Sequence, residues 1–239
     1  MDTFIWCIVL AILLPTTIFG LPAYFAYRRA QAVKAIASQL DLDFHDNKEH
    51  VIPSMMWNSN LYSKERGRDI KNIVSGRRGN ADVFIFDYQY CTGSSRHPAA
   101  HVETVVLLLV DGLHLPCFFL ESKTFSHRVN RLFGYRTIEF AHHPDFSNRY
   151  VLRGSDQASI RQFFSYCVLD MYEAKQSRIY TEGMGNALIF YHHQDGGLST
   201  RLDADHSVPP TDWHKLLEEA LELASIFKQA QRTIEFQNL

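Results

Sequence analysis

The chain has 239 residues, 46% of them hydrophobic and 21% charged, which excludes a disordered protein and leaves room for one ordinary domain with an accessory element. Lys and Arg number 24 against 26 Asp and Glu, a net charge of -2, and no recognition motif is present, so we expect no nucleic-acid partner. The four cysteines are far apart and form no CxxC pair, which argues against a disulfide framework or a zinc knuckle and fits a reducing compartment.

The N-terminus carries an uncharged apolar run over residues 4–27, FIWCIVLAILLPTTIFGLPAYFAY. A helix of this length, rising about 1.5 Å per residue, exceeds the roughly 30 Å of a bilayer's hydrocarbon core. Trp6 near one end and Tyr24 and Tyr27 near the other resemble the aromatic belts of membrane spans. We therefore predict a transmembrane anchor over residues 1–27, with the lipid bilayer as the partner of residues 4–27.

A cleaved signal peptide is the competing interpretation of this run. It requires a basic region ahead of the apolar stretch, yet only Asp2 is charged there. It also requires small residues at the cleavage site, and Tyr24 and Phe25 precede the obvious candidate, Ala26. An uncleaved anchor fits the sequence better.

Basic residues follow the run directly, at Arg28, Arg29 and Lys34. The positive-inside bias places such residues in the cytoplasm. We predict a single-pass protein of the bacterial inner membrane with its N-terminus outside and its C-terminal domain in the cytoplasm, which agrees with the unpaired cysteines.

Residues 28–52 are predicted to form a juxtamembrane helix and a linker. The stretch RRAQAVKAIASQL, residues 28–40, is rich in helix-forming residues. Its apolar residues fall on one helical face, at Val33, Ile36, Ala37 and Leu40. The pattern then breaks, and a further short helix could form around residues 54–64.

Strand patterns dominate the next part of the chain. Residues 69–90 are predicted as a hairpin that turns in SGRRGN, and residues 101–123 as two strands around DGLHLP. The apolar run Val105–Val110 does not alternate, so we expect it to be covered on both faces, as a central strand is. YRTIEF and RYVLRG, residues 135–140 and 149–154, are shorter strand candidates.

Helical and hairpin patterns complete the chain. We predict a helix over residues 156–174 with Ser155 as its N-cap, a second hairpin over residues 178–193, and a last helix over residues 212–232. The apolar stripe of the first helix consists of Ile160, Phe163, Phe164, Cys167 and Met171. In the last helix, Trp213 and Phe227 are expected to pack on the sheet.

Strands without regularly interleaved helices predict an α+β fold. We expect an N-terminal transmembrane helix followed by a mainly antiparallel β-sheet domain over residues 53–239, packed with helices that include a C-terminal helix. A meander closed by such a helix would be similar in shape to a pleckstrin-homology half barrel, an analogy that implies no function.

Asp87 lies within a strand-forming stretch, ADVFIFDYQYCTG, residues 81–93. Side chains alternate along a strand, so Asp87 points away from the aromatic row of Phe84, Phe86, Tyr88 and Tyr90. We expect Asp87 to bond a neighbouring strand, a tyrosine or a basic residue. An acid/base role is the less favoured alternative.

Twelve histidines raise the question of a metal site. His97 and His101 stand four residues apart, a spacing that suits ligation on a helix, but Pro98 and the preceding Gly-Ser predict a loop, and the glutamate of HExxH is missing. The adjacent pairs in AHHP and YHHQD would face opposite sides of a strand. We expect no native metal and no cofactor, although a composite site drawn from several segments stays open.

Arg77 and Arg78 form a small basic tip in the first predicted turn. This tip could touch anionic headgroups beneath the anchor. Glu65 and Asp69 dilute the charge and favour a solvated turn.

Four segments occur in order after the apolar span: FDYQYCTG, HVETVVLLL, LPCFFLESK and HPDFSNRYVLRGSD. In this order the chain resembles a class of uncharacterised bacterial membrane-anchored proteins that have FDY.Y, TVV and FS..Y.LRG segments. The resemblance covers most of residues 1–190. It implies a membrane anchor and no known activity, and no functional residue is carried over from it.

The sequence lacks GxSxG, a recognisable catalytic cysteine and a phosphate loop. This favours a cytoplasmic binding or scaffold domain, with a possible protein partner in the membrane or cytoplasm, over an enzyme. A membrane-tethered hydrolase is one alternative, and its side chains would have to converge on one pocket. A lipid-headgroup-binding domain is another, and it needs a groove or basic patch facing the membrane. The candidates for catalysis are Asp87, His97, His101, Asp145 and His193.

Overall fold

The structure, a computed structural model, describes residues 20–46, 51–63, 66–94, 97–123, 136–175, 179–192 and 204–237. The predicted transmembrane helix lies mostly outside these residues, since only residues 20–27 of the apolar run are described. Among the described residues, no helix is both long and apolar enough to cross a membrane. The span over residues 4–27 therefore stays a prediction.

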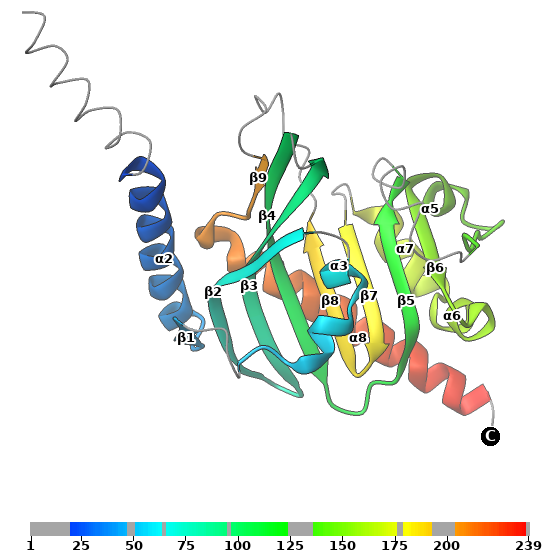
Figure 1. Ribbon diagram of the computed structural model, residues 1–239. Helices are drawn as coiled ribbons and strands as arrows, with labels where there is room; N and C mark the ends of the chain where they lie inside the picture. Colours follow the sequence, from blue (N-terminus) through cyan, green and yellow to red (C-terminus); the bar gives the residue numbers. More distant parts are fainter. Residues whose placement is uncertain are drawn as a thin grey trace, which may run out of the picture.

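One β-sheet organises the fold (Figure 1). Its strands follow the order β1-β2-β3-β4-β8-β7-β5-β6 with every neighbouring pair antiparallel, and β9 pairs with β4 in parallel. The strands are β1 Asp43–His45, β2 Arg66–Arg78, β3 Ala81–Ser94, β4 His97–Val110, β5 Leu115–Ser122, β6 Tyr150–Gly154, β7 Ile179–Gly185, β8 Ala187–His192 and β9 Ala204–His206. The mainly antiparallel α+β prediction is confirmed. The strands do not form a simple meander, because β8 and β7 separate β4 from β5.

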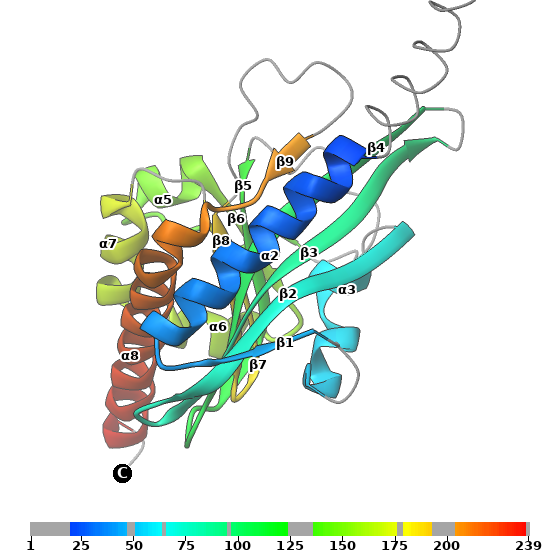
Figure 2. The same ribbon diagram turned by 90° about the vertical axis from the view of Figure 1, so that its left-hand side faces the viewer.

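Helices cover both faces of the sheet. Helices α2 and α8 lie on one face (Figure 2), and η2 and α3 lie against the other (Figure 1). The helices are α2 Leu21–Gln39, the 3-10 helix η2 Ser54–Asn58, α3 Asn60–Ser63, α5 Pro144–Arg149, α6 Gln157–Phe163, α7 Tyr166–Ala174, the 3-10 helix η3 Pro210–Asp212 and α8 Trp213–Gln237.

Each face of the sheet carries its own hydrophobic cluster. Val106 and Leu108 belong to the cluster under α2 and α8, whereas Val105 and Leu107 belong to the cluster under η2 and α3. All four side chains are fully buried. The prediction that this run is covered on both faces is confirmed.

Most predicted elements occur where the patterns placed them. The β2–β3 and β7–β8 hairpins and the juxtamembrane helix α2 are present, with Val33 and Ala37 of α2 buried against the sheet. Helix α8 is longer than predicted and ends at Gln237. Trp213 and Phe227 are buried as predicted, and the same side of the helix buries Leu216, Leu217, Ala220, Leu223 and Ala224.

Three predictions about local structure were wrong. Residues 97–100 form the start of β4 instead of a loop. The predicted helix over residues 156–174 is two helices, α6 and α7, and the N-cap of α6 is Asp156, whose carboxylate accepts from the backbone N–H of Ser159. Of the predicted strand 135–140, the structure describes residues 136–140, and there Ile138 makes an isolated bridge to Leu152 in place of a strand.

Candidate functional site

Asp87 lies in β3, is only 3% exposed, and accepts hydrogen bonds from three side chains. Arg29 of α2 binds it through two nitrogens, with Nε 2.7 Å from Oδ2 and Nη2 2.6 Å from Oδ1. Asn72 of β2 donates from Nδ2 to Oδ2 at 2.6 Å, and Thr104 of β4 donates from Oγ1 to Oδ1 at 2.9 Å. The expected bonds to neighbouring strands and to a basic residue are thus present, and both carboxylate oxygens are engaged.

Local backbone geometry brings Asn72 to this carboxylate. The β2–β3 register shifts between Lys71 and Val74, which marks a bulge in β2. Asn72 has a φ of 52°, a left-handed conformation that asparagine tolerates better than most residues. A bulge re-aims a side chain out of the regular alternation, and here it adds an amide donor to Asp87.

The same network reaches the segment before α8. Arg29 Nη2 donates to the Val208 carbonyl at 3.1 Å, and the Val208 N–H donates to Thr104 Oγ1 at 2.9 Å. Trp213 Nε1 donates to the same carbonyl at 3.2 Å. We call Arg29, Asn72, Asp87, Thr104 and Val208 the Arg29 hub. It joins α2 to three strands and to the start of the C-terminal helix.

Helix α2 meets the domain first at Arg29. Every residue from 20 to 28 is exposed, including large apolar side chains on several sides of the helix. Leu21, Tyr24, Phe25 and Tyr27 are between 49% and 63% exposed. The first turns of α2 therefore project from the domain without protein cover among the described residues (Figure 1).

Three buried glutamates lie on the opposite face of the sheet, at Glu103 of β4, Glu121 of β5 and Glu182 of β7. Tyr180 and Tyr191 stack between them, with ring centroids 4.6 Å apart. Burial raises the pKa of both tyrosines well above the ordinary value, and neighbouring carboxylates add to the effect. No motif in the sequence marked these acids; the signal was a single glutamate inside each strand.

Glu182 fastens α3 to the sheet. The backbone N–H groups of Asn60 and Leu61 donate to its two oxygens at 2.6 and 3.2 Å. Tyr180 donates from its hydroxyl to Glu182 at 3.1 Å, and Asn60 Nδ2 donates to that hydroxyl at 2.8 Å. These bonds satisfy the open N–H groups at the start of a helix that is too short to be stable alone.

The predicted catalytic candidates lie in separate places. His101 pairs with Tyr90 and stacks on its ring at 5.0 Å, so it lies on the face of the sheet opposite Asp87. Asp145 is in the first turn of α5, which leads into β6. Strand β6 is the last in the strand order, far from β3, which carries Asp87. His97 begins β4, and His193 lies outside the described residues. The structure does not bring Asp87, His101 and Asp145 together.

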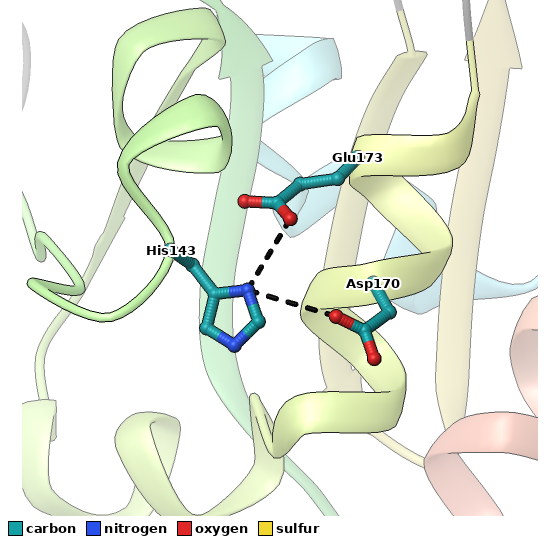
Figure 3. A group of neighbouring side chains, drawn as sticks. All are labelled: His143, Asp170 and Glu173. Carbon is teal, nitrogen blue, oxygen red and sulfur yellow. Dashed lines mark hydrogen bonds and ion pairs between the residues drawn. The ribbon is translucent and has the colours of Figure 1, made fainter.

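A different group of polar side chains meets between α5 and α7 (Figure 3). The Nδ1 atom of His143 is 3.3 Å from Glu173 Oε2 and 3.7 Å from Asp170 Oδ1. Glu173 Oε1 accepts the backbone N–H of Phe146 at 2.8 Å. Among the described residues, this is the one set of three possible metal ligands whose donor atoms lie within 4.8 Å of one another.

A groove of about 720 Å³ lies beside the C-terminal half of α8. Its lining is apolar at Ala81, Val110, Leu221 and Ala224 and carries Lys228 and Arg232, with Asn80, Ser225 and Gln229. Lys228 donates to the backbone carbonyl of Asp111 at 2.7 Å.

Asn80 of the β2–β3 turn lines this groove, and Figure 2 shows that turn at the end of the sheet away from the first turns of α2. Arg77 pairs with Asp82 at 2.8 Å and also with Asp111. The tip is therefore partly neutralised and does not face the side on which an anchor would enter the bilayer.

Comparison with known proteins finds a similar fold but no family. No protein-family model matches the chain, and none of the curated proteins matches it. The fold is similar to the crystal structure of the mycobacterial trehalose monomycolate transport factor A, TtfA, with a TM-score of 0.52 and 13% sequence identity over 82% of this chain and 93% of that chain. At this identity the likeness shows a shared fold alone.

Proposed function

We propose that this chain is a single-pass protein of the bacterial inner membrane whose cytoplasmic α+β domain is a binding or scaffold module for lipid transport. The observation that carries the proposal is helix α2. Its exposed apolar turns are the last part of the uncharged run of residues 4–27, and its next turn is bonded into the domain at Arg29.

The exposure of these turns is costly in water. A fully buried Leu or Phe gains about 1.5–3 kcal/mol over an exposed one, and Leu21 and Phe25 are 49% and 63% exposed. A helix that is apolar on all sides suits lipid better than a protein groove, which covers one stripe. Arg28 extends to 6.0 Å from the Tyr24 ring, an arrangement suited to the headgroup level.

The Arg29 hub would hold the domain directly beneath the membrane. Asp87 pairs with the Arg29 charge, whereas Arg28 and Lys34 form no ion pair among the described residues of α2. Because the hub also engages Thr104 and Val208, the orientation of α2 would be tied to that of the sheet and α8. A fixed domain under the bilayer suits a scaffold.

A scaffold role is favoured over a hydrolase because Asp87 and His101 lie on opposite faces of the sheet. The protein of similar fold is a trehalose monomycolate transport factor, which supports a connection with lipid transport.

Direct lipid binding is the second candidate, favoured by the groove beside α8 with its apolar lining and two basic residues. The groove is lined by the β2–β3 turn at Asn80, and this turn lies away from the start of α2 (Figure 2). The groove would therefore take a lipid released from the bilayer, not a headgroup within it.

Fractionation of cells that express the full chain tests the anchor. The full chain should stay with the membrane after a carbonate wash and be released by detergent, and a chain that begins at Arg28 should lose this behaviour. Release of the full chain by carbonate would contradict the proposal. Lipid analysis of the detergent-purified protein distinguishes the two candidates, since only the second predicts a stoichiometric lipid that Leu221→Asp removes.

A further inference from the structure

His143, Asp170 and Glu173 point toward one another from two separate elements (Figure 3). His143 precedes α5 as its N-cap residue, and the two acids stand three residues apart on α7. We propose that these three residues bind a divalent cation of the zinc type, through His143 Nδ1 and one oxygen from each carboxylate.

The distances suit a shared ion. Zinc binds nitrogen and oxygen ligands at about 2.0–2.2 Å, so two ligands in a tetrahedral arrangement lie about 3.4 Å apart. The His143 nitrogen is 3.3 Å from the Glu173 oxygen and 3.7 Å from the Asp170 oxygen. Small side-chain rotations would therefore complete three of four positions, and the fourth would hold water.

The surroundings fix two of the ligands and leave the third accessible. The Phe146 N–H holds one oxygen of Glu173, which turns the other oxygen toward His143. The His143 ring is buried and lies 5.0 Å from the Tyr166 ring. Asp170 is 68% exposed, so an ion could enter from solvent on that side.

The local charge also favours a cation. Glu173 is in the last turn of α7, where the helix dipole is negative, and Asp170 lies about one turn before it. In the described part of the chain, neither carboxylate forms an ion pair with a lysine or arginine, and the nearby Arg149 donates to the backbone carbonyl of Glu173 instead. A divalent ion would offset the repulsion between the carboxylates of Asp170 and Glu173, which both lie beside His143.

The ligand set indicates the class of ion and its affinity. One imidazole nitrogen with two carboxylate oxygens suits zinc, cobalt or manganese better than magnesium or calcium. The other nitrogen, His143 Nε2, is buried and has no hydrogen-bond partner among the described residues. The loss of such an outer partner typically weakens metal binding about 10–100-fold, so we expect weaker binding than at a structural zinc site.

Titration of the full chain in detergent, after chelator treatment, tests this site. Cobalt is the spectroscopic probe and zinc the competitor, and a thermal melt with and without zinc is the second readout, because a ligand that binds the folded state raises the melting temperature. The wild-type protein should show a visible cobalt band that zinc removes, and zinc should raise its melting temperature.

His143→Gln should abolish the cobalt band and the zinc-dependent shift. Asp170→Asn changes an exposed residue, so the fold should persist while affinity falls at least about tenfold. The matched control is His142→Gln, since His142 is adjacent but exposed and should leave both readouts unchanged. Absence of any cobalt band and melting shift in the wild type, or equal binding by the wild type and His143→Gln, would overturn the proposal.

Discussion

At the scale of single residues, the Arg29 hub explains why an acid stands in an apolar strand. The carboxylate of Asp87 has four donor contacts, two of them from one guanidinium. A buried charge is tolerated when it is paired and hydrogen-bonded, and it is costly when a partner is removed.

The substitution Asp87→Asn should destabilise the protein by about 2–4 kcal/mol. This lies between the cost of losing a charge-assisted hydrogen bond and the cost of leaving the buried Arg29 charge without its partner. The expected loss is smaller than for a fully buried ion pair, because the Arg29 side chain is 21% exposed and can reach water. Chemical denaturation of the full chain in detergent measures the change. As a control, Asp82→Asn removes a surface ion pair and should cost less than about 1 kcal/mol. Equal stabilities of the two variants would contradict a structural role for the hub.

Buried tyrosines should make the fold sensitive to alkali. Burial raises the pKa of Tyr172, Tyr180 and Tyr191 in the folded state, while the unfolded chain releases these protons near the ordinary value of about 10. The stabilisation is therefore complete below about pH 10 and is lost as the pH rises above it. Tyrosinate absorbance should show three of the 11 tyrosines ionising only together with unfolding. Complete ionisation in a folded protein at the same pH would refute this.

Residue-level inference from the sequence was partial. Alternation along β3 was enough to place Asp87 away from the aromatic row and to predict bonded partners. It could not identify Arg29, which is 58 residues away in the chain. The cluster around His143 was equally hidden, because it depends on how α5 meets α7, and adjacent histidines indicate nothing about which one turns inward.

At the scale of elements, the break between α6 and α7 shows where a periodic pattern misleads. Ile160 and Leu169 are nine residues apart and would lie about 180° from each other on one continuous helix. Both are buried, at 0% and 3% exposure. A break at Phe164 and Ser165 lets each helix turn its own apolar side inward, and it leaves the predicted stripe member Cys167 exposed.

The start of β4 has a similar explanation. Within the described part of the chain, residues 97–100 pair with β3 alone, whereas β9 and β8 join β4 further along, at residues 101–103 and 106–109. A proline that cannot donate a ladder hydrogen bond is tolerated in such a stretch, because Pro98 needs no partner on its second side. Pro98 and the preceding Gly-Ser therefore predicted a loop at a place where β3 and β4 continue to pair.

Helix α8 should be essential to the fold. Trp213 is fully buried at its start, and Trp213→Ala should cost about 3–5 kcal/mol through the cavity that it leaves. Thermal or chemical denaturation measures this loss. Phe236→Ala, near the end of the same helix, is the matched control, since this side chain is 78% exposed and its removal should change stability by less than about 0.5 kcal/mol. Retained wild-type stability in Trp213→Ala would show that the helix is an appendage.

At the scale of the whole molecule, the order of the strands in the sheet could not be predicted from the sequence. Consecutive strands β4 and β5 both read correctly as strands, yet two later strands separate them in the sheet. Local sequence patterns predict whether a segment is a helix or a strand, whereas the neighbours of a strand in the sheet depend on long-range packing. The proposed placement of the domain at a membrane rests on the apolar run over residues 4–27 and on the exposure of its last part, the first turns of α2.

Two cysteines of the domain allow the topology to be measured without altering the chain. Cys117 and Cys167 are exposed, on β5 and α7. A membrane-impermeant maleimide, followed by mass spectrometry of the cysteine-containing peptides, reports which side of the inner membrane they occupy. We predict no labelling of either cysteine in intact spheroplasts and labelling of both in inverted vesicles. Labelling in intact spheroplasts, or a mature chain that lacks residues 4–27, would contradict a domain anchored on the cytoplasmic side.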